Sequence, residues 1–157
     1  MGRITTRDQG SAGSTEPTLE TRTQILESTK ASIDCVEIQA LEAARRGGFR
    51  ESIVGHIGLA VREIMVNAVI HGNGCDPQKK VVATISRTPN KLRIEISDEG
   101  DGFDPDHLPN PLSPEGLLKG CGRGVYLARA FMDELYVRRE PVGWTTVIMA
   151  KSVHSAT

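Results

Sequence analysis

The sequence predicts a two-layer α+β sandwich, in which one mixed, mostly antiparallel sheet lies under a helical layer. Two observations support this prediction. Segments with helical patterning precede and separate segments with strand patterning, and the strands come as pairs joined by short turn sequences. A length of 157 residues is that of one domain with a substantial core. We therefore expect a single folded domain over residues 19–157.

The first third of the chain predicts a leader, an edge strand and a helix. Residues 1–18 are rich in Gly, Ser and Thr and carry few apolar side chains. Such a segment cannot offset the entropy lost on ordering, so we expect it to be disordered. Residues 23–28 (TQILES) predict an edge strand, and residues 34–46 predict a helix that ends at Gly47-Gly48.

The central third predicts a long helix followed by a hairpin. The helix runs from Glu51 to about Ile70. Residues 81–87 and 91–98 each alternate between apolar and polar side chains, and Thr88-Pro89-Asn90 between them is typical of a turn. The hairpin is expected to point Leu92, Ile94 and Ile96 into the core.

The last third predicts a long loop, a helix and a second hairpin. The loop covers residues 100–124 and is rich in Pro and Gly; loops of this length in compact domains tend to be functional. A helix is expected over residues 125–134. Residues 134–140 and 144–150 then pair across Pro141-Val142-Gly143.

The overall composition excludes several functional classes. Lys plus Arg number 19 against 20 Asp plus Glu, a net charge of −1, so no global positive field attracts nucleic acid or an anionic membrane. The cysteines Cys35, Cys75 and Cys121 have no zinc-ligand spacing, which favours a reduced cytosolic setting. We expect no segment of the ~18 apolar residues that span a bilayer, and no signal peptide. The expected location is cytoplasmic, with no direct nucleic-acid or membrane partner.

Three polar residues recur at four-residue intervals within the long helix. Because a helix turns about 100° per residue, Glu63, Asn67 and His71 share one face. They could form the solvated stripe of an amphipathic helix, or three short polar groups that face a pocket. Asn and His are less typical of a solvated face than Lys, Glu and Arg, which favours the pocket.

The second polar motif, DEGDG, follows the strand at residues 91–98. Asp98 presents a carboxylate at the strand end, and Gly100 and Gly102 allow either positive φ or close approach of a ligand to the backbone. An ordinary acidic turn has a similar sequence. The motif is therefore weak on its own.

The third motif, GCGRG, places Gly120, Gly122 and Gly124 directly before a predicted helix. Backbone N–H groups at a helix N-terminus form an anion site, and Arg123 could clamp a phosphate there. A flexible linker with a glycine-assisted helix start is the alternative. The spacing fits neither the GxxxxGK[ST] nor the GxGxxG phosphate loop.

Taken together and in this order, EIMVNAVIH, DEGDG and GCGRG resemble the N box and the two glycine boxes of the GHKL ATPases, the superfamily of gyrase, histidine kinases and mismatch-repair ATPases. The short length, GRGVYL and LARAFMDELYV resemble the bacterial anti-sigma-factor serine/threonine kinases. The resemblance covers residues 19–151. It implies the GHKL fold and a homodimeric, ATP-dependent kinase that phosphorylates a small anti-sigma-factor antagonist protein and holds a sigma factor.

The resemblance also implies roles for individual residues. Glu63 matches the catalytic carboxylate and Asn67 the Mg²⁺ ligand. Asp98 matches the adenine reader, with Gly100 and Gly102 in the turn under the base. The phosphate loop comprises Gly120, Gly122 and Gly124, and Arg123 between them is the phosphate-binding candidate that its own chemistry indicates.

The chemistry of these residue types agrees with those roles. Magnesium keeps several waters and takes only one or two protein oxygens besides phosphate oxygens, so a single Asn carbonyl suffices. Glu63 could accept the proton of an attacking hydroxyl, although positioning and charge stabilisation supply most of the catalysis in phosphoryl transfer. His71 is better explained as a helix-end histidine bonded to a carbonyl than as a ligand.

Two other functions remain open at this point. A non-catalytic module could bind ATP only to control its affinity for a protein partner, in which case Glu63 would orient water around the metal. An ATPase fragment of a sensor histidine kinase is less consistent with the sequence, because no phosphoacceptor histidine helix or sensor region precedes the domain.

Overall fold

The computed structural model describes residues 16–102 and 123–153. Five strands and three α-helices occupy these ranges, with one π-helical segment (η1) that continues the second helix. In chain order the elements are β1 (Glu20–Glu27), α1 (Lys30–Arg46), α2 (Glu51–Val66), η1 (Asn67–Gly72), β2 (Lys80–Arg87), β3 (Lys91–Asp98), α4 (Arg123–Phe131), β4 (Glu134–Arg139) and β5 (Thr145–Ser152).

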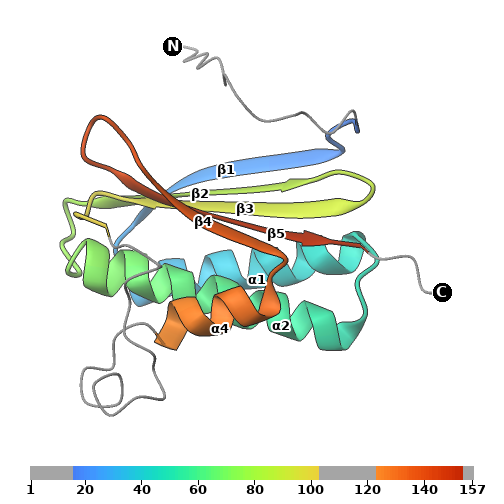
Figure 1. Cartoon of the computed structure of the whole chain (residues 1–157). Helices are drawn as coiled ribbons and strands as arrows, with labels where there is room; N and C mark the ends of the chain where they lie inside the picture. Colours follow the sequence, from blue (N-terminus) through green and yellow to red (C-terminus); the bar gives the residue numbers. More distant parts are fainter. Residues whose placement is uncertain (1–15, 103–122, 154–157) are drawn as a thin grey trace.

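The strands form one sheet in the order β1-β2-β3-β5-β4. Figure 1 shows the helices gathered on one face of this sheet, which confirms the predicted two-layer α+β sandwich. The sequence predicted a mixed, mostly antiparallel sheet, and every pairing between the described strands is antiparallel. Both predicted hairpins are present. The last strand, β5, lies between β3 and β4 in the sheet, so the two hairpins are joined through the pairing of β3 with β5.

The core lies between the sheet and the helices. Leu92, Ile94 and Ile96 of β3 are fully buried, as their alternation with polar residues predicted. Helix α2 packs closely on α1 at Gly58, where an added Cβ would lie 2.5 Å from Leu41 Cδ2. Burying an aliphatic side chain of this size contributes about 1.5–3 kcal/mol, so these contacts fix the helical layer on the sheet.

Helix α1 begins four residues earlier than the sequence predicted, at Lys30 instead of Asp34. The reason is local. The Thr29 side chain accepts a hydrogen bond of 3.2 Å from the Ser32 backbone N–H, which satisfies one of the donors left free at a helix start. The predicted end at Gly47 is confirmed.

The long central helix changes its winding at Asn67. The predicted α-helix over residues 51–70 is correct as far as Val66, after which η1 takes over to Gly72. The Asn73 N–H donates to the Ala68 carbonyl at 2.8 Å, five residues back instead of four. The 100° step assumed from the sequence therefore fails beyond Asn67. His71 is exposed, whereas Glu63 and Asn67 are half-buried.

The combined helix Glu51–Gly72 has the length and apolar composition to cross a membrane, and half of its most apolar window is buried inside the fold. The expectation that no segment reaches this length is therefore wrong. The reason is that α2 packs against α1, α4 and the sheet, and a helix with several buried neighbours carries apolar residues around much of its circumference.

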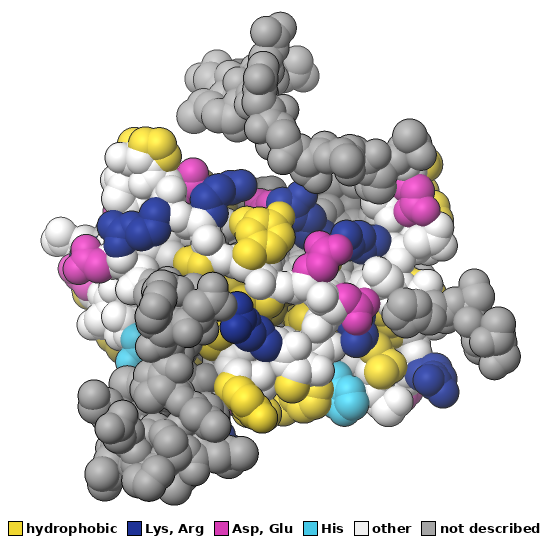
Figure 2. All heavy atoms as spheres, in the orientation of Figure 1, with side chains coloured by type: hydrophobic (Ala, Val, Ile, Leu, Met, Phe, Trp, Pro, Cys, Tyr) yellow, Lys and Arg dark blue, Asp and Glu magenta, His cyan; other side chains and the backbone are white. Residues whose placement is uncertain are grey.

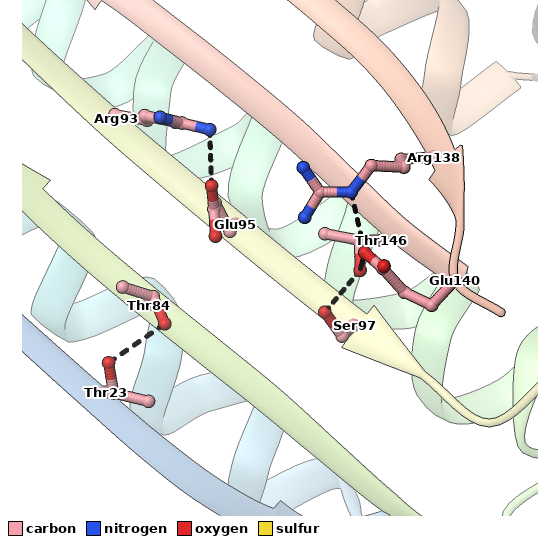
Figure 3. A network of polar contacts seen from close by, with 8 residues as sticks. All are labelled: Thr23, Thr84, Arg93, Glu95, Ser97, Arg138, Glu140 and Thr146. Carbon is pink, nitrogen blue, oxygen red and sulfur yellow. Dashed lines mark hydrogen bonds and ion pairs between the residues drawn. The ribbon is translucent and has the colours of Figure 1, made fainter. Parts of the chain in front are cut away.

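The face of the sheet opposite the helices is lined with polar side chains. Figure 3 shows polar contacts on this face, some between neighbouring strands and some along one strand. Thr23–Thr84, Ser97–Thr146 and Thr146–Glu140 link neighbouring strands, whereas the ion pairs Arg93–Glu95 and Arg138–Glu140 each lie along one strand or its end. The cross-strand pairs each contribute roughly 0.2–1 kcal/mol, and they suit a surface in contact with water.

Candidate functional site

Asp98 ends β3 and is a buried residue, with 6% of its surface exposed. The Gly100 backbone N–H donates to its Oδ1 at 2.7 Å. A carboxylate has lone pairs for further hydrogen bonds, and it can only accept them while it is ionised. The strand end predicted from DEGDG is confirmed, and the burial of Asp98 distinguishes it from an ordinary acidic turn.

Burial raises the pKa of the Asp98 carboxyl above its ordinary value of 3.8. The Gly100 N–H and the positive charge of Lys79 act in the opposite direction, because both favour the ionised form. Desolvation is the larger effect. The fold therefore holds a carboxylate in a place where its charge is costly, which is a feature of binding sites.

Gly72, the last residue of η1, lies directly against Asp98. A Cβ at position 72 would lie 2.6 Å from Asp98 Cγ, and a Cβ at Gly100 would lie 2.6 Å from the Gly72 carbonyl oxygen. Neither distance is possible for a real side chain without movement. The end of the helix and the turn after β3 thus meet around one carboxylate. The sequence predicted a helix to about Ile70 and indicated no role for Gly72 in the site.

Thr145 is a second residue that the sequence analysis missed. It begins β5, pairs with Asp98 in the β3–β5 register and is 0% exposed. Its hydroxyl donates to the Gly100 carbonyl at 3.1 Å, and Gly102, with φ +79°, passes so close that a Cβ there would lie 2.6 Å from Thr145 Oγ1. A polar residue at the head of the apolar run TTVIMA was the available clue.

Glu63 of α2 lies beside the start of α4. A Cβ at Gly124 would lie 2.9 Å from Glu63 Oε2 and 3.2 Å from Glu63 Cβ, so glycine allows the two helices to approach at this point. Arg123 and Gly124 were predicted in the loop, with the helix starting at residue 125. That prediction is wrong, because both belong to the first turn of α4, which packs on α2. Gly120, Cys121 and Gly122 lie outside the described residues.

Asn67 follows Glu63 by one helical turn, and its backbone N–H donates to the Glu63 carbonyl. Among the residues that the structure describes, no three or more His, Cys, Asp and Glu side chains form a group that could hold a metal by themselves. A single amide oxygen is chemically sufficient for Mg²⁺ when phosphate and water supply the remaining oxygens, so the half-buried Asn67 is compatible with a Mg²⁺ ion bound together with a phosphate ligand.

The histidines of this region do not extend the site. His71 is exposed in η1. His56, on α2, stacks on Phe131 at the end of α4, with ring centroids 4.4 Å apart and planes inclined by 8°. An aromatic stack between two packed helices is a packing contact.

Comparison with known proteins identifies the family. The sequence model described as "Histidine kinase-like ATPase domain" matches residues 26–151. Curated relatives include an anti-sigma F factor of Clostridium perfringens, 34% identical over 103 residues that cover 63% of this chain and 72% of the relative. Another is the serine-protein kinase RsbW of Bacillus subtilis, 31% identical over 115 residues that cover 69% and 70%.

A solved structure shares the fold. It is the crystal structure of the RsbU and RsbW domains of a Mycobacterium tuberculosis protein, with a TM-score of 0.61 and 20% sequence identity. The match covers 87% of this chain and 34% of the longer one. These findings confirm the resemblance to the GHKL ATPases that rested on three short motifs. The family model spans most of the chain, and the chain belongs to the family of histidine kinase-like ATPase domains.

Proposed function

We propose that the protein is an ATP-dependent serine/threonine protein kinase of the anti-sigma-factor type. In this proposal it phosphorylates a small antagonist protein and regulates transcription by partner switching with a sigma factor. Support comes from the names of the curated relatives, which are anti-sigma F factors and serine-protein kinases. We take residues 19–157 as the kinase domain and residues 1–18 as a leader.

The adenine is assigned to the Asp98 end of the sheet. An ionised carboxylate accepts a hydrogen bond from the exocyclic amino group of adenine, and guanine presents a carbonyl at the same position. Gly100 and Gly102 form the turn beneath the base. The burial of Asp98 supports this assignment, because a hydrogen bond discriminates best where water is excluded.

The phosphates are assigned to the junction of α2 and α4. The residues proposed here are Asn67 as the magnesium ligand, with Gly120, Gly122, Arg123 and Gly124 around the phosphates. When bound, Mg²⁺ neutralises phosphate charge during transfer. The first turn of α4 contributes backbone N–H groups and the positive end of a helix dipole, both of which favour an anion.

One observation favours a kinase over a module that only binds ATP. The Glu63 carboxylate lies against the first turn of α4 and one helical turn from Asn67, between the elements assigned to phosphate and metal. From that position it can accept the proton of an incoming serine or threonine hydroxyl. A module that only binds ATP needs no base there.

The direct test is phosphoryl transfer to a protein. Purified protein is incubated with γ-labelled ATP, Mg²⁺ and candidate antagonist proteins encoded near its gene, with Glu63→Gln as the matched control. We expect label on a serine or threonine of one candidate with the parent, and far less with Glu63→Gln. Tight ATP binding without transfer to any candidate would favour the non-catalytic module.

The remaining assignments concern partners and location. We propose a homodimer in the cytoplasm, without direct nucleic-acid or membrane contacts. A net charge of −1 supports the absence of nucleic-acid and membrane contacts, and Figure 2 shows basic and acidic side chains interspersed on the visible face. Light scattering on the purified protein should give twice the chain mass of 17.0 kDa.

A further inference from the structure

Asn73 joins three segments of the chain beneath the candidate site. It follows Gly72 directly and is 2% exposed. Its Nδ2 donates to Ser28 Oγ at 2.9 Å and to the Lys80 carbonyl at 3.0 Å, and its Oδ1 accepts from the Glu99 backbone N–H at 2.8 Å. One buried amide therefore ties the residue after β1 to the start of β2 and the end of β3.

The groups around Asn73 are themselves held in place. Glu99 Oε2 accepts a hydrogen bond of 2.6 Å from the Lys80 N–H, and Ser28 Oγ donates to the Lys79 carbonyl at 2.7 Å. Glu99 is thus fixed both at its backbone, by Asn73, and at its side chain, by Lys80. A buried network in which the polar groups have partners is rigid, and removing one member leaves the others unsatisfied.

This network acts on Asp98 from two sides. Glu99 lies between Asp98 and Gly100, the residue whose N–H bonds the Asp98 carboxylate. On the other side, the backbone of Asn73 continues from Gly72, which lies against the same carboxylate. The side chain of Asn73 therefore holds the turn that follows Asp98. Its backbone N–H, bonded to the Ala68 carbonyl, holds the chain next to Gly72, the glycine in contact with the carboxylate.

We propose that Asn73 is a positioning residue that sets the preference for adenine by holding the Asp98 carboxylate, without itself touching the nucleotide. This inference rests on the proposed assignment of adenine to Asp98. It separates two functions within one side chain. The Nδ2 donors tie Ser28 and Lys80 and serve stability, whereas the Oδ1 acceptor ties Glu99 and serves selectivity.

Two variants of Asn73 separate these functions. Asn73→Asp keeps an acceptor for the Glu99 N–H and removes both donors, whereas Asn73→Ala removes all three hydrogen bonds. Both should lower the melting temperature. The ratio of ATP to GTP affinity is the diagnostic measurement, because the phosphates are the same in both ligands and charge effects at residue 73 largely cancel.

The experiment measures dissociation constants of Mg·ATP and Mg·GTP by calorimetry, at a temperature where circular dichroism shows each variant to be folded. We expect the parent and Asn73→Asp to prefer ATP by at least about tenfold, and Asn73→Ala to lose most of that preference. Asn73→Ser, which is too short to reach Glu99, replaces the alanine variant if the latter does not fold.

Two controls exclude a general effect of instability. Leu92→Ala creates a cavity at the opposite end of β3, and it should melt at a clearly lower temperature than the parent while keeping the ATP preference. In an Asp98→Asn background, Asn73→Ala should leave the affinity ratio unchanged, because its effect passes through Asp98.

An unchanged ratio in folded Asn73→Ala overturns the inference while the nucleotide assignment stands. A reduced ratio in Leu92→Ala overturns it as well, since instability alone would then explain the loss. A parent protein that binds neither nucleotide refutes the proposed function, and the inference with it.

Discussion

The backbone of Gly72 packs on the carboxylate of Asp98, so that a Cβ at position 72 would lie 2.6 Å from Asp98 Cγ. This contact joins the end of a helix to the end of a strand from a different part of the chain. It leaves no room for a side chain, and it does not depend on a special backbone conformation, since Gly72 is not among the described glycines with positive φ. The position of the carboxylate is thereby coupled to the size of residue 72.

Gly72→Ala should weaken ATP binding by displacing Asp98. We expect a loss of about tenfold, comparable with the weakening of one charge-assisted hydrogen bond. Gly55→Ala is the matched control, because a Cβ there meets no atom within 4 Å and lies within α2. That control should gain about 0.5–1 kcal/mol of stability with ATP affinity unchanged. Calorimetry and thermal melts on both variants check the prediction. An ATP affinity of Gly72→Ala equal to that of the parent would refute it.

Asn67→Ala should lose the dependence of nucleotide binding on magnesium. The substitution removes the amide oxygen assigned to the metal and leaves the buried face of the helix intact, so the fold should persist. ATP titrations with Mg²⁺ and with EDTA measure the difference. A variant that keeps the parental response to Mg²⁺ would remove Asn67 from the metal site.

Glu63→Gln should bind Mg·ATP with parental affinity and transfer phosphate about 10²–10⁴-fold more slowly. The amide preserves the shape that fits against Gly124 and removes the basic lone pair. Single-turnover transfer to the antagonist protein measures the chemical step separately from binding. Transfer at the parental rate would mean that Glu63 orients other groups and does not accept the proton.

Asp98→Asn should be more stable than the parent at neutral pH. Because burial raises the pKa of Asp98, the folded protein binds more protons than the unfolded chain between the ordinary value of 3.8 and the raised value. Stability of the parent therefore falls as pH rises through that interval, and the penalty persists above it. Asparagine does not ionise, so the advantage of the variant should shrink as pH is lowered toward 3.8.

Thermal melts of both proteins from acid to neutral pH measure this difference. The same substitution should weaken ATP binding and narrow the gap to GTP, since its NH₂ group can donate to the guanine carbonyl. An advantage that grows toward acid pH would contradict the assigned direction of the pKa shift.

The strands could be predicted because the alternation of apolar and polar residues that marks them lies within each strand's own sequence. Leu92, Ile94 and Ile96 alternate with polar residues whatever the rest of the chain does, and the same alternation set the hairpin register. Helix α1 also ended where its glycines indicated. Its start was missed because Thr29 lies ahead of the periodic segment, and only its hydrogen bond to Ser32 marks it as the cap.

The site was predictable only as far as its short motifs reach. Glu63, Asn67 and Asp98 belong to recognisable spacings, but the contacts of Gly72 and Thr145 arise between segments that are distant in sequence. No local pattern indicates that the last glycine of a helix will contact a carboxylate at the end of a strand. The π-helical winding of η1, which contacts the distant strand β3, was likewise not indicated by the local apolar pattern.

The pairing of β3 with β5 has a consequence for how the protein assembles. Asp98 is opposite Thr145 in that pairing, so the candidate site straddles a seam between the portion of the chain that ends at β3 and the portion that contains α4, β4 and β5. Each hairpin pairs strands that are near neighbours in sequence, whereas the seam closes only when the two portions dock, a non-local step that is intrinsically slow. Adenine binding would then stabilise the docked state by about 2.7 kcal/mol at a ligand concentration one hundred times the dissociation constant. Bound nucleotide would thus stabilise the pairing of β3 with β5, and amide exchange along β5 should slow when it binds.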